Sequence, residues 1–147
     1  MKNQILRSSA LLGLFFVLAI ATVNAQTPSR IEVNIPFDFT AGKTTLRAGS
    51  YTIRKTSANL IAIRSLDGKT SALVNAPLTL RSRDFKAGER LVFNQYGERY
   101  FLAQAWLSVD TGQQVFVSGA ETKVAREYRL ASNGAKPRRV EIALQTR

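Results

Sequence analysis

Residues 91–107 (LVFNQYGERYFLAQAWL) carry the densest aromatic content of the chain, and their first arm alternates between apolar and other side chains with a period of two. This period is typical of β-strands, and the corner at Tyr96-Gly97-Glu98-Arg99 is typical of a turn, so the segment predicts a β-hairpin. The second arm is apolar on both phases of the alternation. We therefore expect it to be covered on both faces, as the central strand of a sandwich or of a closed sheet would be.

The same period recurs along the chain. It predicts strands at residues 31–39, 51–54, 60–65, 70–76 and 140–145, and residues 78–83 and 113–117 are candidates for a further strand. Pro36 cannot donate a backbone hydrogen bond, so its strand should lie at an edge or carry a bulge there. The pair Asp67-Gly68 between two apolar runs is the strongest local hairpin signal in the sequence. Residues 84–90 and 108–112 are expected to form a loop and a turn.

One segment has the signals of a helix. Ser118 and Glu121 have the spacing of a capping box, which predicts a helix that begins near Gly119. Its apolar residues recur at helical spacing and would form one stripe that lies on the sheet, namely Ala120, Val124, Tyr128 and Ala131. Asn133-Gly134 should end this helix.

The fold class that follows is all-β. We expect a single antiparallel domain of about seven or eight strands, a meander sandwich or barrel, with one C-terminal helix before the last strand. No internal repeat interrupts this pattern.

The N-terminus has the pattern of an export signal. Lys2 and Arg7 precede an apolar run at residues 11–21, and small residues follow, so we expect a signal peptide over residues 1–25 that is cleaved after Ala25. A retained membrane anchor is the alternative, but the run is shorter than the roughly 20 residues of a spanning helix. Residues 26–147 then form one exported β-domain without a membrane span, located in the periplasm, the outer envelope or the medium of a bacterium.

The chain contains no cysteine and no histidine. Disulfides, thiol chemistry, Ser-His-Asp catalysis and zinc sites of imidazole or thiolate are therefore excluded. Glycines stand singly, without the spacing of a phosphate-binding loop, so no cofactor is expected. A carboxylate-based hydrolase remains an unfavoured alternative, because it needs two acids that face one cleft.

Residues 109–112 (VDTG) resemble the aspartic protease loop, in which two aspartates of a dimer share a proton. The context argues against such a site, since Gln113 stands where a small residue is usual. A turn is the favoured interpretation, with Asp110 capping its own backbone and Gly112 at positive φ.

The formal net charge is +11 at pH 7. A basic surface attracts anionic partners, although it also serves solubility. The candidate binding residues lie on the predicted helix and the segment after it: Lys123, Arg126, Arg129, Arg138 and Arg139. The charge pattern by itself favours a solvated helix face. If the face is functional, the expected partner is an anionic envelope polymer or another envelope protein, and nucleic acid is not expected in an exported protein.

Three motifs resemble a family of small exported bacterial proteins to which no activity is assigned. They are IPFDF with Ala41-Gly42, LRAGSYTI at residues 46–53, and residues 91–106 followed by Asp110-Thr111-Gly112. The family often has Pro where this chain has Arg47, which affects the rigidity of that turn. The resemblance implies export and a β-fold, and it implies no activity.

The sequence therefore favours a non-enzymatic exported envelope or extracellular module that binds a partner or serves structurally, and the basic helix face is its candidate site for an anionic surface or polymer. A closed barrel that carries a small apolar ligand is the alternative, in which Leu102 and Trp106 would line an open cavity.

Overall fold

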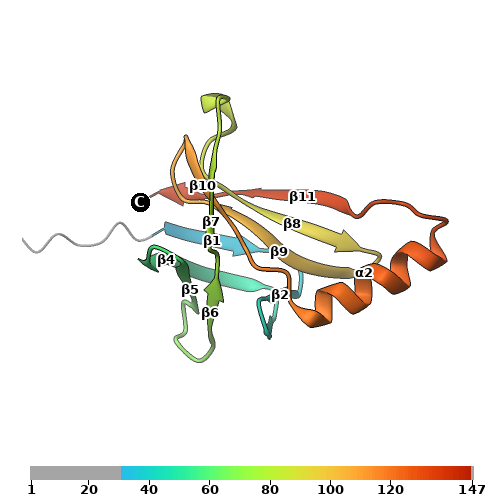
Figure 1. The fold of residues 1–147 in the computed structure, drawn as a ribbon. Coiled ribbons are helices and arrows are strands. Elements are labelled where there is room, and N and C mark those ends of the chain that lie inside the picture. The colour runs from blue at the N-terminus through green and yellow to red at the C-terminus, as the bar shows by residue number, and fades with distance from the viewer. Residues whose placement is uncertain (1–30, 147) are drawn as a thin grey trace, which may run out of the picture.

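The computed structural model describes residues 31–146. The expected signal peptide and its cleavage after Ala25 lie outside these residues. The described strands form two sheets packed face to face, with one α-helix at the end of the sandwich (Figure 1). None of the helices in this part of the chain is long and apolar enough to cross a membrane.

The first sheet has the strand order β12 (Gln145–Thr146), β1 (Ile31–Ile35), β4 (Gly49–Ser57), β5 (Leu60–Ser65) and β6 (Ser71–Asn75). The second has the order β11 (Arg138–Ala143), β8 (Arg90–Tyr96), β9 (Arg99–Trp106), β10 (Thr111–Gln114) and β7 (Leu78–Arg81). The short strand β2 (Phe39–Ala41) joins the second sheet beside β9 and also pairs with β3 (Thr44–Leu46). Only the β2–β9 pair is parallel among these strands.

The predicted fold class is confirmed: an antiparallel sandwich with one helix, α2 (Gly119–Ala131), ahead of the last strands. The described strands do not close into a barrel. They number twelve because several of them have only two to four residues, which leave little periodicity in a sequence.

Strands change sheets at the corners of the sandwich. The chain passes from the first sheet to the second at Pro77, between β6 and β7, and returns at Leu144, between β11 and β12. A strand that bends from one sheet into the other is the usual way in which a sandwich makes its corners. In Figure 1, β6 and β7 follow one another along a single line for this reason.

The prediction of one strand over residues 31–39 is wrong in its extent. The strand breaks after Ile35, and β2 begins at Phe39 in the other sheet. Pro36 removes a ladder donor at the break, and the Asp38 carboxylate accepts a hydrogen bond from the backbone N–H of Ala48 at 2.7 Å. Pro36 was expected to lie in an edge strand or at a bulge, but it lies where the chain leaves the first sheet for the second.

Both predicted hairpins are confirmed. In the β5–β6 turn, Asp67 accepts a hydrogen bond from the backbone N–H of Lys69 at 3.0 Å, and Gly68 has φ of 72°. The β8–β9 hairpin turns at Gly97, with φ of 64°. Each turn takes a glycine because side chains disfavour positive φ.

The predicted loop at residues 84–90 contains a short 3-10 helix, η2 (Phe85–Ala87), and its last residue already belongs to β8. Asp84 caps η2 by accepting a hydrogen bond from the backbone N–H of Lys86 at 3.0 Å.

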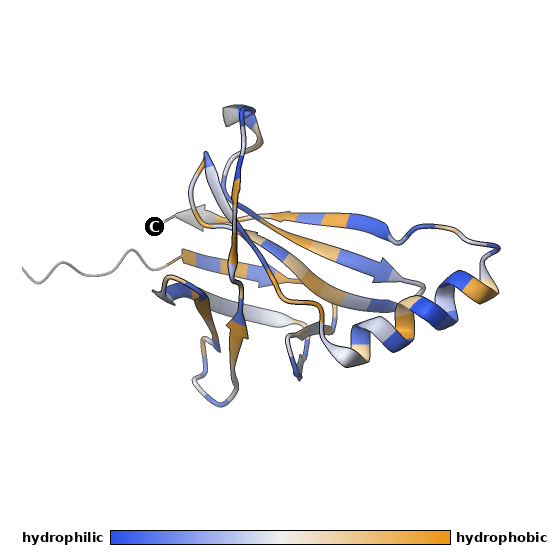
Figure 2. Ribbon diagram, viewed as in Figure 1, coloured by the Kyte–Doolittle hydropathy of each residue, from blue (hydrophilic) through white to orange (hydrophobic). Residues whose placement is uncertain are grey.

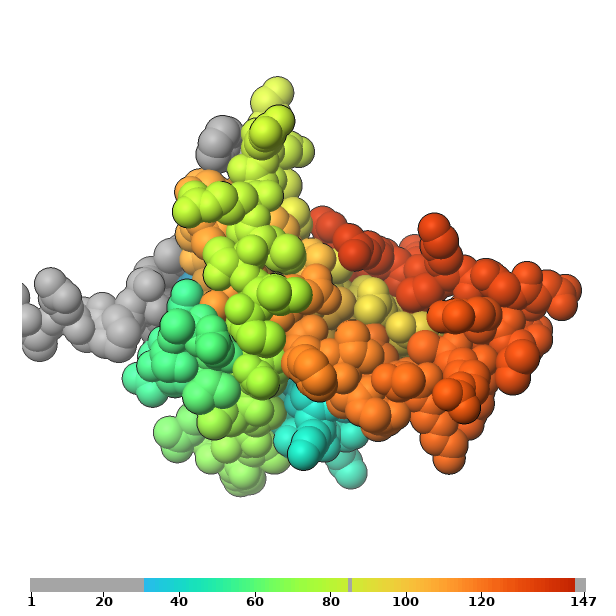
Figure 3. All heavy atoms as spheres, in the orientation of Figure 1, coloured from blue at the N-terminus to red at the C-terminus, as the bar shows by residue number. Residues whose placement is uncertain are grey.

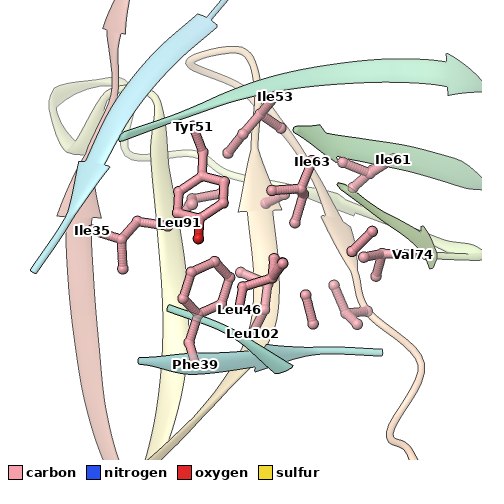
Figure 4. Close-up of a cluster of buried hydrophobic side chains, with 14 of the residues drawn as sticks. Ile35, Phe39, Leu46, Tyr51, Ile53, Ile61, Ile63, Val74, Leu91 and Leu102 are labelled. Carbon is pink, nitrogen blue, oxygen red and sulfur yellow. The ribbon is translucent and has the colours of Figure 1, made fainter. Parts of the chain in front are cut away.

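The main core lies between the sheets. Figure 4 shows apolar side chains from both sheets meeting there, including Ile35 and Ile53 of the first sheet and Leu91 and Leu102 of the second. Phe39 makes edge-to-face contacts with Tyr51 and Phe93 at centroid distances of 5.5 and 5.4 Å. Each large side chain buried here stabilises the fold by roughly 1.5–3 kcal/mol, which explains how the domain is held together without disulfides.

A second, smaller cluster attaches α2 to the outer face of the second sheet. Val124 packs with Tyr96 and Phe101, and Tyr128 contacts the ring of Tyr96 edge to face at 5.8 Å. β9 is therefore covered by the core on one face and in part by α2 on the other. This agrees with the apolar residues on both phases of its sequence.

Candidate functional site

The predicted binding residues of the helix line its exposed side. Lys123, Arg126 and Arg129 are all exposed and recur every three residues, so they form one row along α2. The buried residues of the helix, Glu121 and Val124, lie on the side that faces the sheet. In Figure 2 the hydrophilic residues of α2 appear as separate blue turns along the helix, which projects to one side of the molecule in Figure 3.

The two acidic residues of α2 have their partners outside this row. Glu121 is 4% exposed, and its Oε1 accepts hydrogen bonds from Asn94 Nδ2 at 3.0 Å and from the Tyr96 hydroxyl at 3.2 Å. Glu127 lies 3.6 Å from the guanidinium of Arg99 on the β8–β9 hairpin. Among the described residues, no ion pair includes Lys123, Arg126 or Arg129.

The predicted capping box forms only in its Ser118 half. The hydroxyl of Ser118 accepts a hydrogen bond from the backbone N–H of Glu121 at 3.2 Å, as that motif requires. The Glu121 carboxylate was expected to complete the box, but it turns to the sheet and binds side chains of β8. The carboxylate thus bonds to two side-chain donors of the sheet instead of the backbone N–H of Ser118.

Tyr96 is the group whose ionisation this contact changes most. Burial, together with the neighbouring Glu121 carboxylate, raises the pKa of Tyr96 to about 12, and the positive charge of Arg129 opposes the rise. The tyrosine stays protonated at neutral pH and donates its hydrogen bond to Glu121. Since Arg129 acts on this pair, one end of the basic row lies near the helix–sheet contact.

The two arginines of β11 lie on opposite faces of the second sheet. Arg139 is the cross-strand partner of Asn94, whose side chain reaches α2, so Arg139 lies on the helix side. Arg138 shares its face with Val140, which packs against the main core. The structure thus brings Arg139 to the side of the helix cations and separates Arg138 from them. We name Lys123, Arg126, Arg129 and Arg139 the basic face.

The Asp110 segment is a local turn that runs into a strand. Asp110 accepts hydrogen bonds from the hydroxyls of Ser108 at 2.7 Å and Thr111 at 3.1 Å. These two bonds, that of Ser108 first, hold the pKa of the Asp110 carboxyl below its usual value. Its partners are its own neighbours in sequence, which explains the aspartate without a shared proton.

The expectation of a positive φ at Gly112 is wrong. Gly112 does not belong to the glycines with positive φ; it lies in β10, directly opposite Trp106 of β9. A Cβ at this position would lie 2.4 Å from Cδ2 of the Trp106 ring. The residue is glycine because the indole covers its Cα. The strand β10 begins at Thr111, inside the predicted turn, and ends at Gln114 instead of residue 117.

Trp106 is part of the packing of the outer face and is 6% exposed. The guanidinium carbon of Arg90 lies 4.6 Å from the centre of its ring, and the indole N–H donates to Gln104 Oε1 at 3.1 Å. Leu102, on the opposite face, is 2% exposed within the main core. The ligand-carrier alternative requires both side chains to line an open cavity, and neither of them does.

A different opening lies between the sheets. It is a cleft of about 350 Å³ at the end of the sandwich where the described part of β1 begins and β9 ends. Ile31 and Ile53 line it from the first sheet, and Ala105 and Leu107 from the second. Its polar lining consists of Arg54, Lys55, Ser108, Thr111 and Gln113.

Gln113 is the unusual residue of this cleft, with an exposed fraction of 4%. Its Nε2 donates to the backbone carbonyl of Ala58 at 2.6 Å, which fixes the orientation of the amide. Its buried Oε1 has no hydrogen-bond partner among the described residues. An unsatisfied buried acceptor costs about 1–3 kcal/mol.

Neither Lys55 nor Gln113 stands out in the sequence as a site residue. The signal in the sequence was weak: Gln113 and Val115 share a phase of one strand, so a glutamine stands where an apolar residue is the norm. That β4 and β10 face each other here depends on sheet packing, which the sequence pattern does not give.

Searches against protein-family models, curated proteins and solved structures found no match to this chain.

Proposed function

We propose that this protein is an exported, non-enzymatic module that binds an anionic polymer of the bacterial envelope through the basic face. Export is supported by the charged, apolar and small-residue pattern of residues 1–25. The absence of cysteine is compatible with a folded domain outside the cytoplasm, because the core between the sheets needs no disulfide.

The observation that carries the proposal is the separation of charges on α2. Its carboxylates are engaged by Asn94, Tyr96 and Arg99, while its cations remain exposed and unpaired among the described residues. A solvated helix face commonly interleaves both signs of charge. Here only the cations lack a partner, which favours an anionic partner over solubility as the role of the row.

The spacing of the row suits a polymer better than a single anion. Residues three apart rise by about 4.5 Å along a helix, so the three helix cations extend over about 9 Å. Arg139 adds a fourth cation from β11. Successive phosphate or carboxylate groups on a chain can meet such a row, and each contact contributes about 1 kcal/mol at low ionic strength.

Binding to immobilised heparin, and then to lipopolysaccharide, tests the proposal. The triple variant Lys123→Ala, Arg126→Ala, Arg129→Ala should lose about 3 kcal/mol, or roughly a hundredfold in affinity, at low salt. The control is Lys69→Ala, Arg83→Ala, Lys86→Ala, which removes the same charge from exposed positions in turns away from α2.

A control variant that keeps its affinity would support the basic face. Equal losses in both triple variants would mean that net charge alone drives retention, and unchanged binding in the first would exclude this face. Binding to another envelope protein with no response to heparin would favour the second expected partner.

A further inference from the structure

The strand β7 has one edge without a partner. It stands last in the strand order of the second sheet, and among the described strands it pairs only with β10. The backbone N–H of Ser82 donates to the Asp110 carbonyl at 2.8 Å, so the even-numbered residues of β7 direct their backbone groups toward β10. The N–H and C=O groups of Thr79 and Arg81 therefore point to the open edge. Such an edge is a template for a further strand.

The chain covers the outer edge of β6 but not that of β7. The carbonyl of Asn75 in β6 accepts a hydrogen bond from the backbone N–H of Phe116 at 2.8 Å. Within residues 31–146, no backbone hydrogen bond of this kind includes Thr79 or Arg81. In Figure 3 the yellow-green atoms of β7 lie at the front of the molecule. A second polypeptide can therefore reach this edge.

The sheet face beside the open edge is apolar. Leu80 lies opposite Gly112 in β10, which lies opposite Trp106 in β9. Leu78 and Leu80 therefore share the outer face of the second sheet. Leu78 is 62% exposed, and Phe116, which follows β10, is 65% exposed. Figure 2 shows the segment between β10 and α2 in orange. An added strand would place apolar side chains of its own beside these residues.

The other phase of this edge carries cations. Arg81 lies opposite Thr111, and Thr111 lines the end of the sandwich together with Lys55. Arg83 follows Arg81 by two residues. All three cations are exposed, and none of them forms an ion pair in the described chain.

Two acids lie near these cations, and both are engaged within their own turns. Asp84 accepts a hydrogen bond from the backbone N–H of Lys86, and Asp110 accepts the hydroxyls of its neighbours in sequence. Cations therefore outnumber acids along the open edge, and an acidic segment complements its charge.

We propose that β7 binds an extended segment of another protein as an added antiparallel strand, with apolar residues on one face and acidic residues on the other. Its backbone pairs with Thr79 and Arg81, its apolar side chains lie beside Leu78 and Leu80, and its acids meet Arg81 and Arg83. In strand addition, the main chain supplies affinity and alternate side chains supply specificity. The site shares no residue with the basic face, so it is independent of polymer binding.

The synthetic peptide acetyl-EVEVTVT-amide is the probe for this edge. In antiparallel register its glutamates face Arg83 and Arg81, and its valines lie on the side of Leu78. NMR titration of the purified protein should show saturable shifts centred on residues 78–82. The peptide acetyl-KVKVTVT-amide should bind about fivefold or more weakly, because like charges then face each other.

Backbone methylation separates strand addition from charge attraction. N-methyl groups on the peptide residues opposite Thr79 and Arg81 remove the donors that pair with β7, and they should weaken binding about tenfold or more. N-methyl groups on the alternate residues point away from β7 and should leave the affinity within about threefold.

Two pairs of variants test the protein side. Thr79→Pro removes an N–H that the ladder to β10 does not use, so the protein should fold and lose the peptide, whereas Thr79→Ala should keep it. Arg81→Glu should reverse the preference between the glutamate and lysine peptides. Lys69→Glu, in the β5–β6 turn, should leave that preference unchanged.

Absence of saturable binding, shifts centred outside β7, or equal binding of the two methylated peptides would overturn the proposal. A wild-type dimer in sedimentation that Thr79→Pro dissociates would assign the edge to a second copy and refute a foreign strand. Should Thr79→Pro fail to fold, the methylated peptides decide with the wild-type protein. The triple alanine variant of α2 should bind the peptide normally, so failure of one site leaves the other standing.

Discussion

Replacing Gly112 with alanine should destabilise the protein severely, although alanine is the smallest possible addition. The new Cβ would lie 2.4 Å from Cδ2 and 2.6 Å from Cε3 of Trp106, well inside contact distance. The indole cannot move aside easily, because Arg90 packs on its ring and Gln104 accepts its N–H. Either β10 must shift away from β9, or the ring must leave its place.

The expected loss of stability follows from two opposing terms. Overpacking of a filled site costs about 1–3 kcal/mol, and a clash with a rigid ring falls at the upper end. Removing a glycine from the unfolded chain returns about 0.4–1 kcal/mol. We therefore expect Gly112→Ala to lower the free energy of unfolding by about 2 kcal/mol.

Urea denaturation measures this directly, and Trp106 is the single tryptophan of the chain, so its fluorescence reports on the altered site. Gly119→Ala is the matched control, since a Cβ there meets nothing within 4 Å. It should be neutral or stabilising by up to about 1 kcal/mol. In a protein that also carries Trp106→Leu, Gly112→Ala should lower the free energy of unfolding much less, because the indole ring that the new Cβ would meet is absent. A loss at Gly112 below about 0.5 kcal/mol in the wild-type background would refute the packing of Trp106 over β10.

Further outcomes concern the attachment of α2. Glu121→Ala should lower the free energy of unfolding in urea by about 1.5–3 kcal/mol, because Asn94 and Tyr96 lose a charged acceptor. Glu127→Ala should change the free energy of unfolding by no more than about 0.5 kcal/mol. Equal losses in the two variants would contradict the buried contact. Ser118→Ala should cost about 1 kcal/mol of stability by removing the helix cap, and no change in urea midpoint would argue against that cap. Because the pKa of Tyr96 is about 12 in the folded protein against an ordinary 10.0, the unfolded chain loses this proton first as pH rises. Stability should therefore fall between about pH 10 and 12, by about 1–2 kcal/mol after solvent screening, and Tyr96→Phe should make this fall shallower.

The features that the sequence predicted correctly depend on neighbours in the chain. The turn at Gly68 needs only Asp67 and a residue that tolerates positive φ. The start of α2 needs only the hydroxyl of Ser118 near its first turn, and its end needs Asn133, which adopts φ of 52°. Each signal acts within a few residues, so it survives in the sequence.

The features that were missed depend on residues that are distant in the chain. Glu121 has the spacing of a capping box, yet a donor 27 positions away on β8 captures its carboxylate. Gln113 binds a carbonyl 55 positions away, and the role of Gly112 appears only when β9 and β10 are in register. Alternation gives the phase of each strand, and it does not give the partner strand.

The candidate cations were visible in the sequence, but their grouping was not. Arg138 and Arg139 are adjacent in the chain, and strand alternation places them on opposite faces of the sheet. Only Arg139 joins the helix cations. The basic face is therefore a product of the register between β8 and β11.

The salt dependence of polyanion binding tests the central claim most directly. Binding through several cations releases counterions, so affinity for heparin should fall linearly with the logarithm of salt concentration. For the Lys123, Arg126, Arg129 triple alanine variant the slope should be shallower than in the wild-type protein, while the Lys69, Arg83, Lys86 control should keep the wild-type slope. Identical slopes for all three proteins would contradict the account, because the cations of α2 would then make no contact with the polymer.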